Sequence, residues 1–196
     1  MTASPLLSAT PSHLKPRKFE RRSLLPIEPN YLWRIESGVV RTLTYNPDGT
    51  LITFGLWGVG DIAGKVLSKA DPYQIECLTP VEAALIPLSR GYEVSEAIFQ
   101  HVQQHQEFIE ILHCRSVDTS LMQLLIWLAK KFGKASEQGQ LIDLQLTHQD
   151  IASVIRATRV TVTRLLNEFE QRGIIQRLPH RFIVMPNQQP FWHYEI

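Results

Sequence analysis

Two short amphipathic helices, each with its own cap and separated by a tight turn, are predicted near the C-terminus and constrain the fold more than any other feature. Thr147 is a favourable N-cap, and Asp150 follows in the first turn, where the helix dipole stabilises negative charge. Arg156-Ala157 forms the predicted turn, and Thr158 caps a second helix over residues 159–172. The apolar positions that would pack the helices together are Ile151, Ala152, Val154, Ile155, Val162, Leu165, Leu166 and Phe169. This order of caps, turn and apolar stripes predicts a helix-turn-helix.

The side of the second helix that faces away from its apolar stripe carries arginine and threonine. Arginine can donate two hydrogen bonds to guanine O6 and N7, and threonine can bond a base edge or a phosphate. After Gly173, two short strands at residues 174–176 and 182–184 flank Pro179-His180 and predict a wing whose basic side chains reach phosphates. We therefore predict that this segment reads the major groove of double-stranded DNA. The predicted DNA-binding residues are Thr147, Gln149, Thr158, Arg159, Val160, Thr161, Thr163, Arg164, Arg177, His180 and Arg181.

One local sequence signal argues against a DNA-binding helix-turn-helix, whereas the distribution of charge along the chain is compatible with DNA binding. The run Val160-Thr161-Val162-Thr163 is β-branched and, taken alone, is typical of a strand. The capped order of helix, turn, helix and wing is nevertheless consistent over all of residues 147–184 and favours DNA binding. The chain carries a net charge of +1, but residues 1–22 hold five Lys and Arg against a single Glu, and residues 145–196 hold six Arg against four acidic residues. Excess positive charge at both ends is compatible with a nucleic-acid partner.

The N-terminal part of the chain lacks the helical periodicity of the C-terminal part. Residues 1–18 contain Ser, Thr, three prolines and basic side chains without periodicity, and we expect a flexible basic tail. Asn46-Pro47-Asp48-Gly49 is the clearest hairpin turn, because Asp-Gly supplies the positive φ that such turns need. Residues 19–91 hold short apolar runs at 31–35, 39–45, 50–56, 75–78 and 81–86. Turn residues separate these runs, so we predict a sandwich or barrel of short strands.

A long helix is predicted next, over residues 93–116, within a dimerisation segment assigned to residues 92–117. Ile98, Val102, His105, Ile109 and Leu112 recur at alternating spacings of four and three residues, the pattern of a coiled-coil seam with one polar member. We expect these five side chains to form a homodimer interface. The alternative is an amphipathic helix packed against its own domain, because the pattern lasts for only about three heptads.

The segment assigned to the winged helix-turn-helix domain, residues 118–196, begins with a further helix. Asp118 is the predicted N-cap, and the helix runs to Phe132 before Gly133 ends it. A polar loop is expected at residues 134–140, followed by a short strand at residues 141–144. This helix would connect the dimerisation segment to the helix-turn-helix.

Residue types disfavour several other classes of protein. Cys77 and Cys114 are too few for a disulfide framework or a four-thiolate cluster, and we interpret them as inert thiols in a reducing cytoplasm. No apolar run is long enough to span a membrane, and no secretory signal follows the basic N-terminal residues, so we expect a cytoplasmic protein. No nucleophile–base arrangement or phosphate-cradling glycine loop stands out, so we expect no enzyme activity and no catalytic residues.

Three histidines accompany the helix predicted at residues 93–116. His101 and His105 are four residues apart, and His113 lies two turns further on. This spacing would suit a metal or haem site. The alternative is a set of seam or surface histidines, which we favour because no carboxylate or thiolate partner accompanies them. We therefore predict no metal and name no cofactor.

From Phe19 onwards the chain resembles the CRP/FNR superfamily of bacterial regulators. The motifs that carry the resemblance are Tyr31-Leu-Trp-Arg-Ile-Glu-Ser-Gly38, Gly60-Asp-Ile-Ala-Gly64 and Leu146-Thr-His-Gln-Asp-Ile-Ala152. The string Thr158-Arg-Val-Thr-Val-Thr-Arg-Leu-Leu166 is similar to the recognition helix of the cyanobacterial NtcA-type global nitrogen regulators. The resemblance implies an α+β fold with an N-terminal β-roll (a double-stranded β-helix or jelly roll), a long dimerisation helix and a C-terminal winged helix-turn-helix. It also implies a homodimeric transcription regulator that binds a palindromic operator and contacts RNA polymerase.

The sequence departs from this superfamily where its members bind effectors. Cyclic-AMP-binding members have a Gly-Glu pair and an Arg-Ser/Thr pair, but here Gly64 precedes Lys65, and Asp71-Pro72 occupies the second pair. Aspartate repels a phosphate, and proline lacks a backbone donor. The two arginines with which the nitrogen regulators bind 2-oxoglutarate align with Asp71 and His101. We therefore expect neither compound to bind in the family's manner, and the effector stays unknown.

Two functional hypotheses remain open. The first is an activator or repressor that binds its operator as a homodimer, and the second is a sensor or interaction module whose output depends on an unidentified ligand or protein partner.

The first hypothesis also predicts the sequence of the operator. Val160 replaces the glutamate with which cyclic-AMP-type relatives bond cytosine, and it can pack against a thymine methyl. Because the nitrogen regulators share this recognition face and read GTA half-sites, the operator is expected to resemble GTA-N8-TAC.

Overall fold

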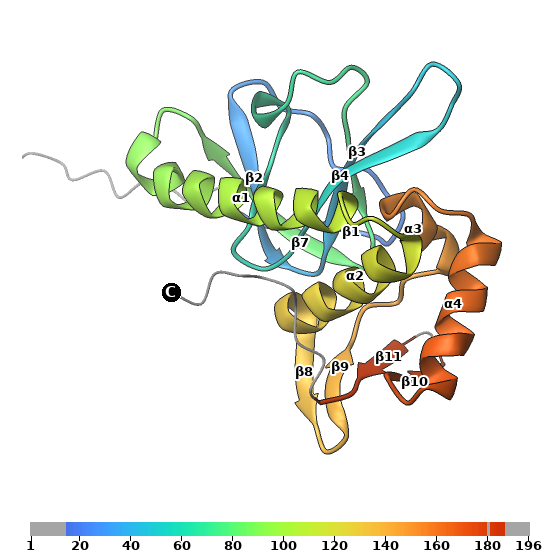
Figure 1. The fold of residues 1–196 in the computed structure, drawn as a ribbon. Helices are drawn as coiled ribbons and strands as arrows, with labels where there is room; N and C mark the ends of the chain where they lie inside the picture. The colour runs from blue at the N-terminus through green and yellow to red at the C-terminus, as the bar shows by residue number, and fades with distance from the viewer. Residues whose placement is uncertain (1–14, 180, 187–196) are drawn as a thin grey trace, which may run out of the picture.

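A computed structural model describes residues 15–179 and 181–186 of the chain. An N-terminal β-roll, a long helix that crosses its face and a C-terminal winged helix-turn-helix follow one another along the sequence, as the resemblance implied (Figure 1). Residues 1–14 of the predicted tail and the predicted wing residue His180 lie outside the described residues. Within the described part of the chain, no helix is long and apolar enough to cross a membrane.

The β-roll is built from two antiparallel sheets with strand orders β1-β7-β2-β5 and β4-β3-β6. Both sheets contribute to one apolar core, in which Trp33 of the first sheet and Ile75 of the second are fully buried. The strands are β1 Arg17–Phe19, β2 Tyr31–Ser37, β3 Val40–Tyr45, β4 Leu51–Trp57, β5 Ile62–Ala63, β6 Gln74–Cys77 and β7 Val81–Pro87, with a short 3-10 helix at Lys65–Leu67. The predicted sandwich of short strands is thus confirmed.

The predicted hairpin turn connects β3 to β4. Tyr45 pairs with Leu51, and Asn46 N donates to Thr50 O at 2.9 Å. Gly49 has a φ of 82°, which a residue with a Cβ adopts only with strain. The prediction from the Asp-Gly pair is therefore confirmed.

Two helices connect the β-roll to the C-terminal domain: α1 spans Gly91–Leu112 and α2 spans Val117–Phe132. The expected N-cap at Asp118 is wrong, because Ser116 occupies that position and its side chain accepts a hydrogen bond from Thr119 N at 3.4 Å. Asp118 instead lies inside the first turn, where the helix dipole also favours it. The first helix is also shorter than the predicted 93–116 range, since α1 ends at Leu112.

Two stretches that looked irregular in the sequence form strands. Residues 17 and 18, assigned to the flexible tail, belong to β1, which pairs with β7 through Arg17 and Ala83. The expected polar loop at residues 134–140 is a β-hairpin made of β8, Gly133–Ser136, and β9, Gly139–Ile142. Both corrections have one cause: neither stretch shows the apolar alternation of a strand, and each strand forms through backbone pairing with a neighbouring strand, β7 for β1 and β9 for β8.

The C-terminal domain contains the predicted helix-turn-helix and wing. Helix α3 spans His148–Val154, α4 spans Arg159–Gln171, and the wing strands are β10, Ile175–Leu178, and β11, Arg181–Val184. The wing strands join the β8–β9 hairpin in one sheet of order β10-β11-β9-β8. A continuous apolar core connects α2, α3, α4 and this sheet, so the recognition helix is rigidly supported.

Candidate nucleic-acid interface

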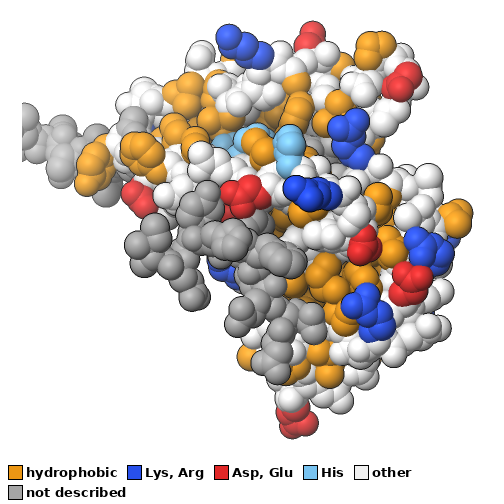
Figure 2. Space-filling view, viewed as in Figure 1, with side chains coloured by type: hydrophobic (Ala, Val, Ile, Leu, Met, Phe, Trp, Pro, Cys, Tyr) orange, Lys and Arg blue, Asp and Glu red, His pale blue; other side chains and the backbone are white. Residues whose placement is uncertain are grey.

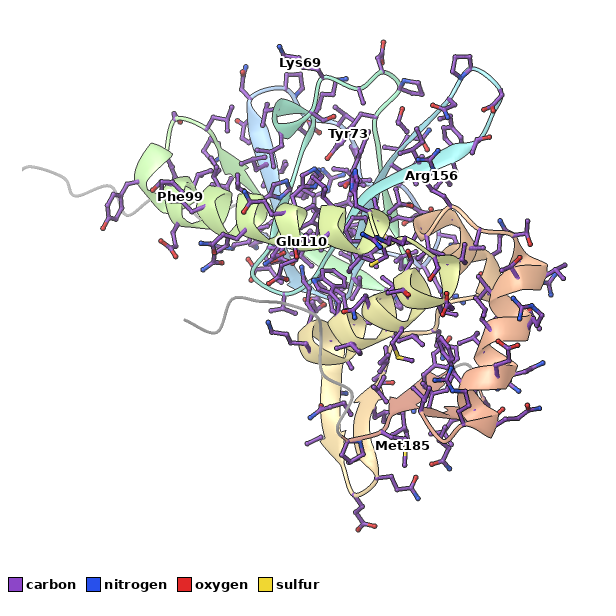
Figure 3. All side chains as sticks on the ribbon, in the orientation of Figure 1. Lys69, Tyr73, Phe99, Glu110, Arg156 and Met185 are labelled. Carbon is purple, nitrogen blue, oxygen red and sulfur yellow. The ribbon has the colours of Figure 1, made fainter. Side chains whose placement is uncertain are left out.

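Both predicted caps of the helix-turn-helix are present. Thr147 Oγ1 accepts a hydrogen bond from Asp150 N at 3.0 Å, and Asp150 Oδ2 accepts one from Thr147 N at 2.9 Å, which completes a capping box. Thr158 Oγ1 accepts a hydrogen bond from Thr161 N at 3.1 Å and caps α4. Between the helices Arg156 has a φ of 55°, the left-handed conformation that turns the chain after α3 (Figure 3). The arrangement of α3 and α4 therefore follows from the local sequence.

Helix α4 buries its predicted stripe and exposes the predicted recognition face. Val162, Leu165, Leu166 and Phe169 are all buried. Arg159, Val160 and Arg164 are exposed, and 78% of Val160 is accessible to solvent. A β-branched apolar side chain gains nothing from such exposure in the free protein, but it matches the methyl group that thymine presents in the major groove. The exposed face therefore has the chemistry of a base-reading surface.

A groove of about 860 Å³ lies between the helix-turn-helix and the wing. Three arginines line it, Arg159 from α4 and Arg177 and Arg181 from the wing, against the single carboxylate of Glu170. Positive charge in a concave surface beside a recognition helix suits a phosphate backbone. The remaining lining residues are Leu146, Thr147, His148, Gln149, Leu178, Pro179 and Phe182. The structure thus brings residues from both predicted elements, the helix-turn-helix and the wing, to one surface.

His148 also lines this groove, although the DNA-binding residues predicted from the sequence include only its two neighbours, Thr147 and Gln149. Its Nδ1 lies 2.8 Å from Thr163 Oγ1, and Thr163 Oγ1 donates its hydrogen to Arg159 O at 2.9 Å. Because that hydroxyl has no second hydrogen, its oxygen must accept from an Nδ1–H of His148. Burial, followed by the charges of Arg177 and Arg159, lowers the pKa of His148 and favours the neutral imidazole. His148 therefore ties α3 to α4, and Thr163 uses its hydrogen within the protein.

Several of the basic side chains are held by acidic partners on the protein. Arg164 pairs with Glu168 at 2.8 Å, Arg177 with Glu170 at 2.7 Å and Arg181 with Asp143 at 3.0 Å. Every side chain in these pairs is at least 28% exposed, so each pair contributes little to stability and can be exchanged for a phosphate or base. Among the residues that the structure describes, Arg159 has no carboxylate within ion-pair distance. Of the four arginines predicted to bind DNA, Arg159 is therefore the one most directly available to it.

Comparisons with known proteins agree with this geometry. The profile of the Crp-like helix-turn-helix domain matches residues 120–189. The regulatory protein CysR of Synechococcus elongatus is 40% identical over 167 residues, which cover 84% of this chain and 81% of that protein. The chain belongs to the CRP/FNR family. Like other CRP/FNR proteins, it is a DNA-binding transcription regulator with a helix-turn-helix domain.

Further relatives place the chain within this family. The global nitrogen regulator of Synechococcus elongatus is 31% identical over 184 residues, which cover 83% of this chain and 82% of the regulator. A CRP-family transcriptional regulator from Thermus thermophilus has the same fold, with a TM-score of 0.74 at 22% identity over 86% of this chain and 91% of that one. FixK2 from Bradyrhizobium japonicum gives a TM-score of 0.72 at 18% identity over 90% of this chain and 95% of that one. The predicted relationship to the CRP/FNR superfamily and to the nitrogen regulators is confirmed.

Lys65 and His101, which the sequence led us to align with effector-binding positions of the family, both make contacts within the protein. Lys65 Nζ donates a hydrogen bond to Ala70 O and lies 6.0 Å from the ring centre of Tyr73. The ring of His101 stacks on Trp57 with centroids 3.9 Å apart, and its Nδ1 lies 3.2 Å from a backbone oxygen of β5. Burial lowers the pKa of His101 to about 4, so the imidazole is neutral at pH 7. His101 thus fastens α1 to the β-roll.

The three histidines do not converge. The ring centroids of His101 and His105 are 6.5 Å apart, whereas His113 Nδ1 bonds Ile109 O of its own helix at 2.9 Å. Within the described ranges, no group of three or more His, Cys, Asp or Glu side chains is placed to hold a metal ion.

The predicted dimer seam is only partly exposed. Val102 and Ile109 are 49% and 40% accessible, but Ile98 packs against the β-roll and Leu112 against the C-terminal core, while His105 is half-buried. Phe99, which is not one of the five predicted seam residues, is 66% accessible. The exposed apolar strip of α1 is therefore Phe99, Val102 and Ile109, and hydrophobic side chains are visible along the helix in Figure 2. Ile98 and Leu112 are partly buried against the protomer's own cores, and their place in a dimer seam stays a prediction.

Proposed function

We propose that this chain is a homodimeric regulator that binds a palindromic operator of the form GTA-N8-TAC. The observation that carries the proposal is the arginine-lined groove beside α4, together with Arg159, which lines it, and the exposed neighbouring side chain of Val160. Arg159 supplies donors for guanine, and Val160 supplies an apolar surface for the adjacent thymine. The nitrogen regulators, which the chain resembles in this helix, share the same face.

The exposed strip on α1 supports the homodimer. Phe99, Val102 and Ile109 are three and seven residues apart and share one side of the helix. Apolar side chains in this arrangement are stabilised when a second copy of the helix covers them. A two-fold axis along α1 would place two recognition helices about 34 Å apart, one turn of DNA. RNA polymerase is the further partner that we propose for the bound dimer, as in other regulators of this kind.

We further propose that neither cyclic AMP nor 2-oxoglutarate controls this protein. Asp71 is exposed and repels an anion, and His101 is committed to its stack with Trp57. Isothermal titration with either compound at millimolar concentration should give no heat of binding. Operator affinity, measured by fluorescence anisotropy with and without the compound, should also be unchanged. A saturating isotherm for one of them, together with a gain in affinity, would contradict the effector part of the proposal.

Selection from random duplexes tests the operator. The purified protein should enrich palindromes with GTA and TAC half-sites separated by eight base pairs, without any added extract. Enrichment of the TGTGA half-site would show that Val160 is not read as proposed, and the absence of any consensus would contradict sequence-specific binding. Enrichment that requires a cell extract or metabolite would favour the alternative of a module controlled by a ligand or partner.

A further inference from the structure

A network of four charged side chains joins the β-roll to the helix-turn-helix. Arg22 Nη1 and Nη2 donate to the two carboxylate oxygens of Asp150 at 2.9 and 2.7 Å, a bidentate pair between residues 128 positions apart. Arg22 Nη1 also lies 3.1 Å from Glu76 Oε1 on β6. Arg41 on β3 donates from Nε to Glu76 Oε2 at 2.6 Å and approaches Asp150 Oδ1 at 3.5 Å. The network therefore contains two arginines and two carboxylates.

Three of these four groups are largely removed from water. Arg41, Glu76 and Asp150 are almost fully buried, whereas Arg22 is partly exposed. The hydrogen bonds from Arg22 and Thr147 outweigh burial and lower the pKa of Asp150, so its carboxylate stays charged. Removing one partner from a buried network leaves an uncompensated charge, which is strongly unfavourable. The two domains are thus held in the orientation that keeps all four charges paired.

The backbone beside Arg22 is fastened to the same strand of the β-roll. Arg22 N donates to Cys77 O at 2.7 Å, and Arg22 has a φ of 70°, an uncommon conformation for a residue with a side chain. The neighbouring Arg21 reaches both domains, because its Nε donates to Leu78 O at 3.0 Å and its Nη2 to Gln145 O at 2.9 Å. Arg21 and Arg22 belong to the N-terminal excess of positive charge that is compatible with a nucleic-acid partner, but in the structure they make contacts inside the protein.

The anchored carboxylate is also the one that caps α3. Asp150 Oδ2 accepts hydrogen bonds from both the backbone and the hydroxyl of Thr147, at 2.9 and 2.7 Å, while it bonds Arg22. The N-terminus of α3 is therefore fixed to the β-roll, and the shared core transmits this position to α4. Arg41 adds a contact to the next turn of α3, with Nη1 at 3.3 Å from Ser153 Oγ.

A second attachment lies at the far end of α2. Lys131 Nζ pairs with Asp61 Oδ2 at 2.7 Å and donates to Leu56 O at 3.0 Å, both in the β-roll. Phe132 packs so closely over Gly58 that a Cβ there would come within 2.7 Å of its ring. One attachment would act as a hinge, but two separated attachments prevent rotation of the C-terminal domain about either of them.

We propose that the Arg22–Asp150–Arg41–Glu76 network sets the half-site spacing that the dimer accepts, by fixing the orientation of the helix-turn-helix on the β-roll. This inference rests on the proposed operator binding. One added base pair moves a half-site by about 3.4 Å and rotates it by about 35° around the DNA axis. A rigid dimer cannot follow both changes, whereas a dimer with loosened helix-turn-helix domains can. Arg22 and Glu76 are then positioning residues that act through Asp150.

The test measures affinity for palindromes with spacers of seven, eight and nine base pairs. Arg22→Met removes the bidentate pair, and Arg22→Lys keeps the charge but not the planar fork. The double variant Arg22→Met/Glu76→Gln removes one charge of each sign, so that Arg41 and Asp150 remain paired with each other. It replaces the single variant in the test if Arg22→Met does not fold. Arg34→Met is the matched control, since Arg34 pairs with Glu36 at 2.8 Å within β2 and its side chain is 36% exposed, against 38% for Arg22. Asp150 is left unchanged because it closes the capping box.

Wild type and Arg34→Met should lose at least about ten-fold in affinity when the spacer changes by one base pair. Arg22→Met and the double variant should show about three-fold discrimination or less, with the same half-site sequence preferred, and Arg22→Lys should lie between. Folded variants that keep the wild-type spacing profile would overturn the inference and leave operator binding intact. Failure of the wild type to bind any palindrome would instead overturn the proposed function, and the inference with it.

Discussion

Replacing both Val102 and Ile109 by aspartate should abolish specific operator binding, with a loss of about a thousand-fold, down to the level of non-specific DNA. Both side chains belong to the exposed strip of α1, so the substitutions leave the protomer's own cores intact. In the proposed dimer they would bury four uncompensated charges along the two-fold axis. A monomer presents one recognition helix at a time and loses the second half-site.

Sedimentation equilibrium at micromolar concentration and fluorescence anisotropy with a GTA-N8-TAC duplex would measure the two effects. Tyr45→Asp is the matched control, because Tyr45 is 40% exposed, like Ile109, and lies at the end of β3 in the hairpin that projects away from α1 (Figure 1). Its oligomeric state and affinity should equal those of the wild type. Leu112→Asp is not a suitable probe of the interface, since that side chain packs against the C-terminal core. A Val102→Asp/Ile109→Asp protein that stays dimeric and binds the operator would contradict the proposed interface.

Arg159→Ala should cost about 1–3 kcal/mol of operator binding and relax the choice at one base pair of each half-site. Arg159 is exposed at the start of α4 and lines the groove, and a bidentate arginine accounts for an effect of this size. The measurement is a repeated duplex selection with the variant, together with anisotropy titrations on single-substituted operators. Arg172→Ala is the matched control on the same helix, because Arg172 lies at the C-terminal end of α4.

Two further arginines, Arg181 of the groove and Arg164 of the exposed face of α4, give a comparison that separates base reading from phosphate contact. Arg181→Ala should weaken all duplexes to a similar extent and reduce the slope of log affinity against log salt by about 1. The ion pair of Arg164 with Glu168 in the free protein is exposed and weak, so Arg164 can exchange it for a base. In that case Arg164→Ala should lower affinity and relax base preference as Arg159→Ala does. Uniform weakening by Arg159→Ala, with the consensus unchanged, would reassign Arg159 from base reading to backbone contact.

The parts of the structure that the sequence predicted well depend on contacts between near neighbours. The caps at Thr147 and Thr158 are satisfied by backbone groups three residues away, and the Asp-Gly hairpin closes within four residues. The buried stripe of α4 has the same origin, since residues three and four positions apart share a helix face. The order of the domains was predicted from the motifs that the chain shares with the CRP/FNR superfamily.

The spacing of apolar residues along α1 does not by itself show which face of the helix is exposed. Ile98, Phe99, Val102, Ile109 and Leu112 are all apolar, and two overlapping seams can be drawn through them. The β-roll and the C-terminal core select Ile98 and Leu112 as internal contacts, which leaves Phe99 in the exposed strip. The short strands β1 and β8 were missed for a related reason, because their hydrogen-bonding partners stabilise them more than their own side chains do.

The contacts between the domains could be read only from the tertiary structure. Nothing in the local pattern distinguishes Arg22, bound to a carboxylate 128 residues away, from the basic residues Lys15, Arg17 and Lys18 that precede it. His148 was likewise passed over, since its role depends on Thr163 being brought to it from the next helix. Local sequence encodes caps, turns and amphipathic faces through interactions a few residues long. Which charged groups are buried together depends on how those elements pack, because pairing compensates desolvation only in the folded arrangement.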